Sequence, residues 1–448
     1  MTCPDLRGFL SDLDGDLLRV RQEFDPKHEI AALLRETQDG PAVLFENVRG
    51  YPGARVVGNV MASRRRMARA LETTESDLAP TYMQRTRRSV PPVATKGPAP
   101  AQEVVHRTPA DLLGILPVLT HYERDAAPFI TCGVVLATDP ETGRRGMGIH
   151  RMMVKGGNKL GIFLANPPLS QFLDRAEAVG KPLEIAVALG VDPATLVAAV
   201  VKVGPLGPDK MEIAGALRGA PVELVKAATV DVQVPANAEI IVEGKVLPGV
   251  REQEGPFGEN TGYYFSNVSP VVEVSAITHR REFIYQGLCP WTADVDTLLS
   301  LAQGAESLAQ LRSLVHGVTD LDLTAGTCGF SAVIAVRGCA PAEVRRLIGL
   351  ALNLDRRLKS VTVVDDDVDI RNPREVAWAL ATRFQPDRDT VIMSGLEGYV
   401  IDPSTGERGI GSKMGFNATR GQGQAFDKVT IPPEAARKAR AILAEMAR

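Results

Sequence analysis

The spacing of apolar residues changes twice along the chain and divides it into three parts. In the first part, Asp5–Leu18, Glu29–Glu36 and Ala62–Leu71 carry apolar residues on one side of a predicted helix, and the apolar run 41–48 predicts a strand. In the second part, Phe129–Tyr285, short β-rich runs are separated by Gly, Pro and Asp. This pattern is typical of a largely antiparallel sheet or barrel.

The last third alternates between strand and helix patterns. Residues 329–338 predict a strand, Pro341–Leu352 a helix and residues 359–370 another strand. Asn372–Glu375 then combines an Asn N-cap, a Pro at the first helical position and a Glu that completes a capping box, so a further helix begins there. Strand–helix–strand order implies βαβ units in an α/β layer, with a terminal helix over Glu434–Met446.

A proline-rich stretch and two internal helices complete the outline. Ser89–Glu103 contains four prolines and marks a domain boundary; an ordered surface loop is favoured there over a hinge. Helices over Leu169–Ala178 and Pro193–Val201 interrupt the β-rich part. The fold class is therefore α+β or α/β with several domains, which we place at 1–105, 106–300 and 301–448.

Composition narrows the class of protein further. The chain has 448 residues, 44% hydrophobic, and a formal net charge of -3, so a folded protein without a broad basic face for nucleic acid or membranes is expected. The N-terminus has no signal-peptide pattern, and no apolar run is long enough to span a bilayer. Five scattered cysteines without a CxxC pair suit a reducing cytoplasm, where we expect the protein.

The segment EGPFGE at 254–259 holds the most informative pair of acidic residues. Glu254 and Glu259 would point to different faces of a regular strand or helix, but the two glycines and the proline favour a bent loop that turns both towards one cavity. Two carboxylates in a site of low dielectric do not both ionise easily, so one can act as an acid. Arg151 could hold the other ionised and bind a substrate carboxylate. Taken alone, a solvated turn and a surface ion pair are the more ordinary readings.

Three other segments have weaker chemical signals. Gly409–Gly415, with Lys413, could bind a phosphate through backbone N–H groups or could be a flexible turn. The acidic run Asp365–Asp367 could bind a cation, although a polar strand end is favoured because no metal-loop spacing is present. Cys289 is interpreted as a buried structural thiol rather than a nucleophile.

These segments, in this order, resemble the UbiD-type family of prenylated-flavin decarboxylases. The matching stretches are EGPFGENTGYY (254–264), YPGARVVGNV (51–60), RMMVKGGNKLGIFL (151–164), VELVKAATVDVQVPANAEIIVEG (222–244), VVDDDVDIRNPREVAWALATRFQPDRD (363–389) and SKMGFNAT (412–419). The resemblance implies an N-terminal α/β region, a central split β-barrel of flavin-reductase type and a C-terminal α/β domain. It also implies a homodimer or hexamer with the C-terminal helix at subunit contacts.

The resemblance also implies the reaction and the roles of residues. A member of this family decarboxylates an aromatic, heteroaromatic or α,β-unsaturated acid reversibly, through a covalent adduct with prenylated FMN that a flavin prenyltransferase supplies. Arg151, Glu254 and Glu259 match the family's catalytic triad, with Glu259 as the proton donor and Glu254 paired to the arginine. Lys413 matches a lysine on the flavin phosphate, and Glu223 a ligand of manganese, near which potassium or sodium lies.

Two positions depart from the family pattern. Gly146 stands where the family has Asn, and Asn166, in Ala165–Pro168, lies where a metal-binding His is expected, so metal identity and occupancy stay open. The sequence GIHR and the two prolines after Asn166 resemble the furan-, pyrrole- and indole-carboxylate branch. An alternative to the enzyme is a non-catalytic flavin-binding or structural subunit of a larger carboxylase assembly.

The remaining expectations concern the cofactor and the substrate. Ile149 and His150, next to Arg151, are expected to contact the cofactor. Flat aromatic rings and hydrogen-bonding groups suit a planar acid. The expected pocket residues are His150, Trp291, Thr292, Asp294, Thr327 and Phe330, for each of which ordinary core or loop packing is the alternative.

Overall fold

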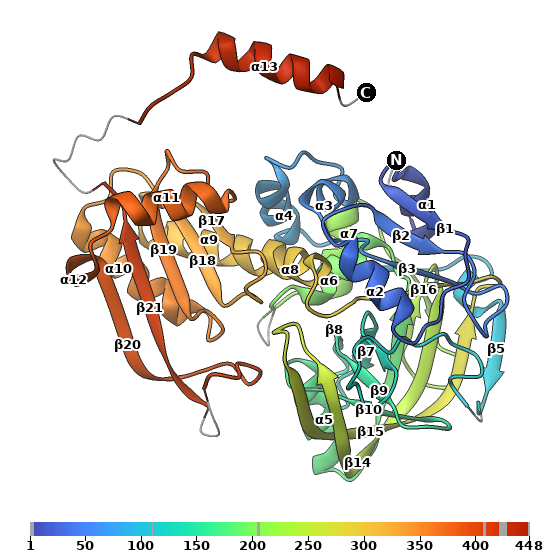
Figure 1. The fold of residues 1–448 in the computed structure, drawn as a ribbon. Coiled ribbons are helices and arrows are strands. Elements are labelled where there is room, and N and C mark those ends of the chain that lie inside the picture. Colours follow the sequence, from blue (N-terminus) through green and yellow to red (C-terminus); the bar gives the residue numbers. More distant parts are fainter. Residues whose placement is uncertain (1–3, 110, 204–206, 406–408, 421–427, 447–448) are drawn as a thin grey trace.

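The computed structural model describes residues 4–109, 111–203, 207–405, 409–420 and 428–446, and Figure 1 shows their arrangement. The polypeptide forms an N-terminal α/β layer, a large central sheet and a C-terminal α/β layer. The mixed α/β, multidomain fold is therefore confirmed.

The N-terminal layer is a four-stranded sheet in the order β1-β2-β3-β16. Its elements are α1 (Leu6–Asp12), β1 (Leu17–Val20), α2 (Glu29–Glu36), β2 (Ala42–Phe45), β3 (Arg55–Gly58), α3 (Arg64–Ala70), α4 (Leu78–Thr86) and, from much later in the chain, β16 (Ile284–Gln286). The helix predicted over Asp5–Leu18 is too long. Asp5 caps it by accepting from the Gly8 N–H, but Gly15 takes a φ of 73° and the chain then enters β1.

The central sheet contains nine strands, and all of its pairings are antiparallel, as predicted. Its strands are β5 (Val104–Arg107), β6 (Phe129–Ile130), β7 (Val134–Thr138), β8 (Arg145–Ile149), β9 (Met152–Val154), β10 (Lys159–Ile162), β11 (Leu183–Leu189), β14 (Ile240–Gly258) and β15 (Tyr264–His279). The order is β6-β9-β10-β15-β14-β11-β7-β8, with β5 added on β15. Within the described chain no pairing joins β6 to β8, so the sheet is not closed into a barrel.

Three helices and a small sheet accompany the central strands. The helices are α5 (Leu169–Ala178), α6 (Pro193–Val200) and α7 (Lys210–Arg218), the first two close to their predicted bounds. The small sheet joins β4 (Val93–Ala94), β12 (Glu223–Lys226) and β13 (Gln233–Pro235), with the 3-10 turn η1 (Pro100–Gln102) after β4. The proline-rich stretch is thus an ordered connection that contains a short strand.

A run of helices leads from the central sheet into the C-terminal layer (Figure 1). The elements are α8 (Ala293–Leu299), the π-helical turn η2 (Ser300–Gly304), α9 (Ala305–Leu314), β17 (Val318–Leu323), β18 (Ser331–Val336), α10 (Pro341–Leu354), β19 (Ser360–Asp365), α11 (Pro373–Arg383), α12 (Pro386–Asp389), β20 (Thr390–Glu397), β21 (Ile410–Ala418) and α13 (Pro433–Met446). The sheet order is β17-β18-β19-β21-β20. Strands β18 and β19 run parallel on either side of α10 in the chain, as the predicted βαβ unit requires, whereas β20, the strand that follows α11 and α12, runs antiparallel to β21.

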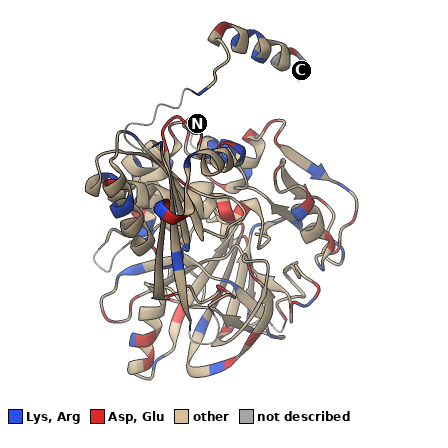
Figure 2. Cartoon of the chain, turned by 60° about the vertical axis from the view of Figure 1, so that its left-hand side comes forward, with Lys and Arg blue, Asp and Glu red and all other residues tan. Residues whose placement is uncertain are grey.

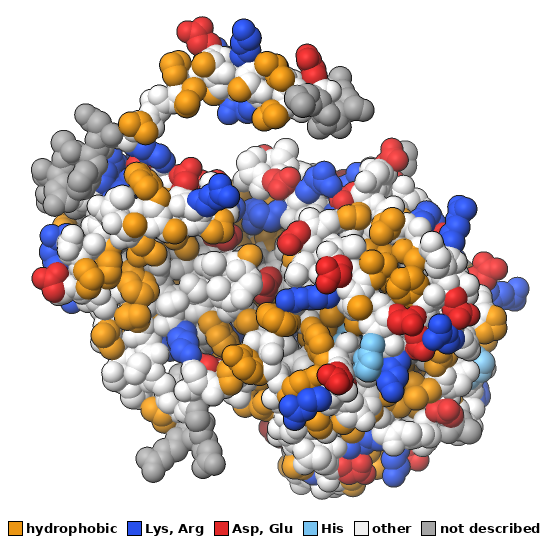
Figure 3. Space-filling view, in the orientation of Figure 1, with side chains coloured by type: hydrophobic (Ala, Val, Ile, Leu, Met, Phe, Trp, Pro, Cys, Tyr) orange, Lys and Arg blue, Asp and Glu red, His pale blue; other side chains and the backbone are white. Residues whose placement is uncertain are grey.

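Two local predictions in this layer need correction. The helix start at Asn372 is confirmed, but no capping box forms, because Asn372 accepts from the Arg374 N–H and Glu375 accepts from the Asp369 N–H. The glycine-rich segment Gly409–Gly415 is not a turn, because Ile410 begins β21 and pairs with β20. Helix α13 stands apart from the rest of the chain (Figure 3), and its Ile442 and Leu443 side chains are exposed.

Candidate active site

The two glutamates of the EGPFGE segment reach the same side of the sheet through an irregularity in β14. Glu254 pairs with Asn267, yet Phe257 pairs with Phe265, so the register with β15 shifts between Glu254 and Phe257. Gly255 lies inside this shift with a φ of 94°. The segment is therefore a bulged strand rather than the predicted loop, and the bulge cancels the odd spacing that would otherwise send the two carboxylates to opposite faces.

Arg151 lies between these two carboxylates. It follows the end of β8 by two residues and donates from Nε to Glu254 Oε1 at 2.8 Å. Its Nη1 is in close contact with Glu259 Oε1. Glu254 has no exposed surface, and 9% of Glu259 is exposed. The structure thus places one guanidinium and two carboxylates together, and the carboxylate nearer to solvent belongs to Glu259.

The surroundings of Arg151 are apolar. Its guanidinium carbon lies 4.3 Å from the ring centroid of Phe163, 5.0 Å from that of Phe257 and 5.4 Å from that of Phe265. Burial lowers the pKa of Arg151, and the nearby Glu254 carboxylate partly opposes this shift. The three aromatic rings were not predicted as site residues, because sequence periodicity does not show which rings surround a charge.

Two buried polar atoms of this cluster have no hydrogen-bond partner among the described residues, namely Arg151 Nη2 and Glu254 Oε2. Leaving such groups unsatisfied is costly, and nearly all of them in folded proteins are paired. A bound molecule with a carboxylate and a hydrogen-bond donor would satisfy both atoms. The arrangement therefore fits a small polar ligand next to Arg151.

The position of Gly255 gives a first prediction. An alanine Cβ there would lie 2.6 Å from the carbonyl oxygen of Phe265, and the φ of 94° is unfavourable for any residue with a Cβ. Gly255→Ala should therefore destabilise the protein by about 1–3 kcal/mol, measured by urea unfolding. Gly249→Ala, at a φ of 69° but with no atom within 4 Å, is the matched control for the φ alone. Equal losses in both variants would contradict the role of the Phe265 contact.

His150 is buried beside Arg151, and its Nδ1 lies 2.9 Å from the carbonyl oxygen of Phe163. Burial lowers its pKa to about 4, the Phe163 hydrogen bond opposes the shift and the nearby Lys210 adds to it. Ile149, the last residue of β8, pairs with Val134. Both residues predicted to contact a cofactor therefore lie directly next to the Arg151 cluster.

The low pKa of His150 makes stability depend on pH. The unfolded state binds a proton below about pH 6.5, whereas the native state binds it only near pH 4. Stability is therefore lost as pH falls through this window, by about 2 kcal/mol from this residue between pH 7 and pH 5. His150→Gln should lose correspondingly less stability over that range in urea titrations, whereas His316→Gln, at an exposed position, should behave like the unmodified protein. An unchanged pH profile in His150→Gln would contradict the assignment.

Three of the predicted pocket residues lie on the segment that precedes and begins α8. Trp291 packs against Gly262, whose hypothetical Cβ would be 3.1 Å from the indole, and Arg35 lies over the same ring at 3.9 Å. The Thr292 hydroxyl donates to the Cys289 carbonyl at 2.7 Å. Asp294 is buried and accepts from the Met61 N–H at 2.6 Å, and burial raises its pKa to about 6. These contacts are ordinary core and loop packing, which sequence analysis gave as the alternative to a substrate pocket for these residues.

The other two predicted pocket residues lie in the loop between β17 and β18. The Thr327 hydroxyl donates to the Thr324 carbonyl. Phe330 contacts Tyr399 edge-on at 6.4 Å, and Tyr399 in turn acts electrostatically on Arg151. The same loop reaches the turn after Glu259, because the Cys328 thiol donates to the Asn260 carbonyl at 2.9 Å. The C-terminal layer thus reaches the turn after Glu259 through Cys328, which lies between the predicted pocket residues Thr327 and Phe330.

The residues expected at a divalent metal do not converge. Within the described ranges no three His, Cys, Asp or Glu side chains could hold one ion. Glu223 is exposed and only accepts from Asn237 Nδ2 at 3.3 Å. A Cβ at Gly146 would lie 2.5 Å from the Phe172 ring, so that ring fills the space of the expected Asn, and Asn166 is exposed. The residues present therefore do not fit a divalent ion.

Lys413 and the acidic run also have partners of their own. The Lys413 ammonium donates to the carbonyl oxygens of Leu352 and Asp355 at 2.8 and 3.1 Å, within the C-terminal layer. The structure therefore does not bring it together with Glu223. Asp365 and Asp367 both accept from Arg383, which supports the reading as a polar strand end.

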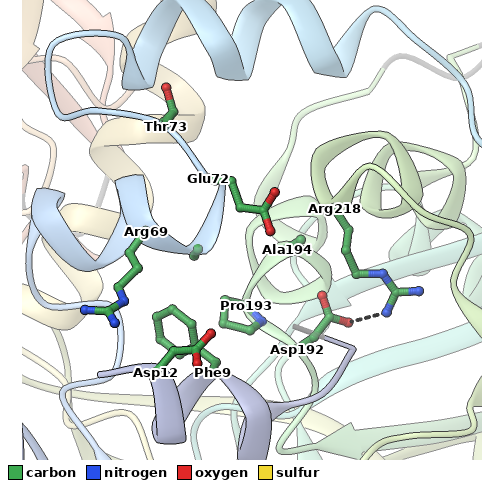
Figure 4. Close-up of a pocket in the computed structure, with 10 residues that line it drawn as sticks. Phe9, Asp12, Arg69, Glu72, Thr73, Asp192, Pro193, Ala194 and Arg218 are labelled. Carbon is green, nitrogen blue, oxygen red and sulfur yellow. Dashed lines mark ion pairs between the residues drawn. The ribbon is translucent and has the colours of Figure 1, made fainter. Parts of the chain in front are cut away.

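A cavity of about 300 Å³ opens elsewhere, between the N-terminal layer and α6 (Figure 4). None of the predicted site residues lines it. Its wall includes the ion pair between Asp192 and Arg218 at 3.5 Å, drawn as a dashed line. Asp192 also caps the N-terminus of α6, because its carboxylate accepts from the N–H and the hydroxyl of Thr195. Asp192 and Arg218 in the wall of this cavity therefore have structural partners.

The distribution of charged residues and the hydropathy of the helices agree with the expectations drawn from composition. Lys and Arg are interspersed with Asp and Glu over the described chain (Figure 2). No helix in the described part of the chain has the length and apolarity needed to cross a bilayer.

The comparisons with known proteins cover nearly the whole chain. Family models of 3-octaprenyl-4-hydroxybenzoate carboxy-lyase match residues 11–86 (N-terminal domain), 93–293 (Rift-related domain) and 296–418 (C-terminal domain). The anhydromevalonate phosphate decarboxylase of Methanothermobacter thermautotrophicus is 34% identical over 92% of this chain and 96% of that protein.

Solved structures agree with the family models. The UbiD-class enzyme HmfF from Pelotomaculum thermopropionicum, in complex with FMN, matches with a TM-score of 0.93 and 40% identity over 98% of this chain and 99% of its own. An evolved dimeric form of that enzyme, in complex with prFMN, matches with a TM-score of 0.89 and 40% identity over 96% and 98%. The 3,4-dihydroxybenzoic acid decarboxylase of Enterobacter cloacae matches with a TM-score of 0.90 and 30% identity over 97% and 99%. The chain therefore belongs to the UbiD family and is a carboxy-lyase of that class.

Proposed function

We propose that this enzyme decarboxylates an aromatic, heteroaromatic or α,β-unsaturated carboxylic acid, reversibly and without oxidation, with prenylated FMN as its cofactor. The observation that carries the proposal is the buried cluster of Arg151, Glu254 and Glu259. In this cluster Arg151 Nη2 and Glu254 Oε2 have no hydrogen-bond partner among the described residues. Among the relatives, HmfF binds FMN or prFMN, and two others are a 3,4-dihydroxybenzoic acid decarboxylase and an anhydromevalonate phosphate decarboxylase.

The roles follow from charge balance in the cluster. One guanidinium opposes two carboxylates, so the buried cluster is neutral when one of the two acids carries a proton. Glu254 is fully enclosed and accepts from Arg151 Nε, whereas Glu259 is closer to solvent and can exchange its proton. When bound, prenylated FMN would supply the sink for the electron pair that stays on the substrate carbon as CO2 leaves. Glu259 then gives its proton to the carbon that has lost CO2, and Arg151 positions the substrate carboxylate.

The substrate class is proposed from the aromatic border of the cluster. Phe330 and Tyr399 form an edge-on pair on the side of the C-terminal layer, and a flat ring can pack against either face. His150 is too deeply buried and too firmly bonded to Phe163 to be an acid, which leaves it to shape the pocket as a neutral ring. A furan-, pyrrole- or indole-type acid fits these groups.

The domain bounds 1–105, 106–300 and 301–448, and the description of the central sheet as a split barrel, belong to the same proposal. So does assembly as a homodimer or hexamer through α13, whose Ile442 and Leu443 are exposed, as are Val429 and Ile431 before it. A fragment 106–448 that fails to fold without the N-terminal region would count against these bounds, since β16 pairs with the N-terminal sheet although it lies in the second range.

The test is an assay of CO2 release. The chain would be co-expressed with a flavin prenyltransferase and supplied with furan-, pyrrole-, indole-, dihydroxybenzoic and cinnamic-type acids. Turnover of at least one acid, dependent on the prenylated flavin, is expected. A protein that binds flavin and releases CO2 from none of them would instead be the non-catalytic subunit of a larger carboxylase.

A further inference from the structure

Asp125 is a buried carboxylate in the loop between β5 and β6, outside the Arg151 cluster. Its side chain has no exposed surface. Oδ2 accepts from the N–H groups of His121 and Tyr122 at 3.1 and 2.9 Å, and Oδ1 accepts from the Gly258 N–H at 2.8 Å. Burial raises the pKa of this carboxyl, and the same three N–H groups oppose the shift. No Lys or Arg of the described ranges forms an ion pair with it, so backbone N–H groups are its main partners.

The hydrogen bonds of Asp125 differ in how far they reach along the chain. The bonds from His121 and Tyr122 close a local turn, which an aspartate does in many loops. The bond from Gly258 joins residues 133 positions apart, and Gly258 directly precedes Glu259. A hydrogen bond to this N–H fixes the peptide plane from which the backbone continues to Glu259. Asp125 therefore connects its loop to the segment that carries the proposed acid.

The same loop contacts the hairpin of β14 and β15 at two further points. The Ala126 N–H donates to the Pro256 carbonyl at 2.8 Å, inside the bulged segment. On the opposite strand, the Arg124 N–H donates to the Tyr264 hydroxyl at 3.0 Å, and the Arg124 guanidinium carbon lies 4.8 Å from the centroid of that ring. Tyr264 pairs with Gly258 in the register of the two strands. The loop thus holds both strands where the hairpin turns.

On its other side, Glu259 is held mainly by bonds within the turn. Its N–H donates to the Tyr263 carbonyl and its carbonyl accepts from the Gly262 N–H, both at 3.0 Å, and its Oε2 accepts from the Asn260 N–H at 3.3 Å. These bonds would move together with the turn. The Cys328 thiol, which reaches the Asn260 carbonyl from the C-terminal layer, is a weak donor. The direction of the Glu259 side chain therefore also depends on how the strand that leads into the turn is held.

We infer that Asp125 is a positioning residue for the proton transfer: by accepting from the Gly258 N–H it fixes the direction of the Glu259 carboxyl, without touching the substrate itself. The inference rests on the proposed function, because it assumes that Glu259 is the proton donor. A misplacement of about 1 Å can cost about 100-fold in rate, so losing the bond should lower kcat rather than raise KM. Sequence analysis did not single out Asp125, because the polar run 123–125 reads as a solvated loop.

The experiment compares Asp125→Asn with the unmodified enzyme, both loaded with prenylated flavin, in H2O and in D2O. The asparagine oxygen can keep the two local N–H groups, but its amide nitrogen then faces the Gly258 N–H and cannot accept from it. The kcat for CO2 release should fall at least about 10-fold, and KM should stay within about threefold of its original value. The ratio of kcat in H2O to kcat in D2O should rise, because proton transfer from a displaced Glu259 then limits the rate. A mere loss of folded protein would lower kcat equally in both solvents.

Glu243→Gln is the matched control. Glu243 is likewise a buried carboxylate, and it accepts from the N–H groups of Ala228 and Thr229 at 2.8 and 2.6 Å. It lies near the opposite end of β14 from the Arg151 cluster. This variant should lose stability in urea unfolding and keep both the kcat and the solvent isotope effect of the unmodified enzyme.

The outcomes separate the inference from the proposed function. An unmodified protein that releases CO2 from none of the acids would overturn the proposed function. Turnover that Asp125→Asn leaves unchanged, or lowers equally in H2O and D2O, would overturn the inference alone. If Asp125→Asn does not fold, Asp125→Ser decides by the same readings, since its hydroxyl oxygen can close the local turn but is too short to reach Gly258. Rapid exchange of the Gly258 amide with D2O in the unmodified enzyme would also overturn the inference.

Discussion

Glu259→Gln should abolish CO2 release while the protein still folds and binds flavin. The amide is nearly the same size, so it can still contact Arg151 and close the site, but it has no acidic proton to give. A positioned general acid contributes about 10²–10⁴-fold to rate. The kcat for the best substrate should therefore fall by at least about 100-fold, measured as CO2 release at saturating acid. Glu252→Gln is the matched control, because this half-exposed carboxylate on β14, the strand that leads to Glu259, pairs with Lys155 outside the cluster.

A second measurement isolates the proton step in the same variant. Because a reaction and its reverse share one path, an enzyme that protonates the product carbon also removes that proton. The unmodified enzyme should therefore exchange the product's C–H hydrogen in D2O without CO2, and Glu259→Gln should not. Rapid exchange in Glu259→Gln together with lost CO2 release would assign Glu259 to the carboxylate step instead and contradict its role as proton donor.

Sequence analysis predicted which residues form the Arg151 cluster more accurately than it predicted the backbone conformation that brings them together. Glu254 and Glu259 were expected to face one cavity because glycine and proline between them signalled an irregular segment, and their grouping with Arg151 was implied by the family resemblance. The ion pairs of the structure bring all three together. The kind of irregularity was wrong. A bulge depends on the register of β15 against β14, which is set by residues far apart in the chain.

Burial explains most of what the sequence did not show. Lys210 and Lys413 are both lysines at ordinary positions in a motif or helix, and only tertiary packing shows one bonded to Ala199 and the other to Leu352 and Asp355. The sequence raised doubt about a metal through Gly146. It could not show that the Phe172 ring fills the space beside Gly146, because this depends on the packing of α5 on β8. Strand and helix periodicity predicted the layers well, because it depends on nearby residues alone.

Glu254→Ala should destabilise the central sheet strongly, by about 3–5 kcal/mol. The substitution leaves the Arg151 guanidinium buried among Phe163, Phe257 and Phe265 with Glu259 as its remaining carboxylate. The loss is measured by urea unfolding in a Trp378→Phe background. Trp291, which packs on Gly262 three residues after Glu259, is then the single fluorescent tryptophan and reports on the site.

A double-mutant cycle shows whether the loss comes from the buried Arg151 Nε–H that has lost its acceptor or from the cavity. If the buried donor is the cause, adding Arg151→Leu to Glu254→Ala should recover a large part of the stability, because that unsatisfied donor is then gone. If the cavity is the cause, the double variant should be no more stable than Glu254→Ala, and the pairing of Glu254 with Arg151 would contribute little to folding. In the first case the same ion pair that holds Arg151 for the substrate also keeps the bulged strand β14 in register. Stability and catalysis would then depend on the same contact. Substitutions of Arg151 or Glu254 that alter substrate preference would therefore also destabilise the protein.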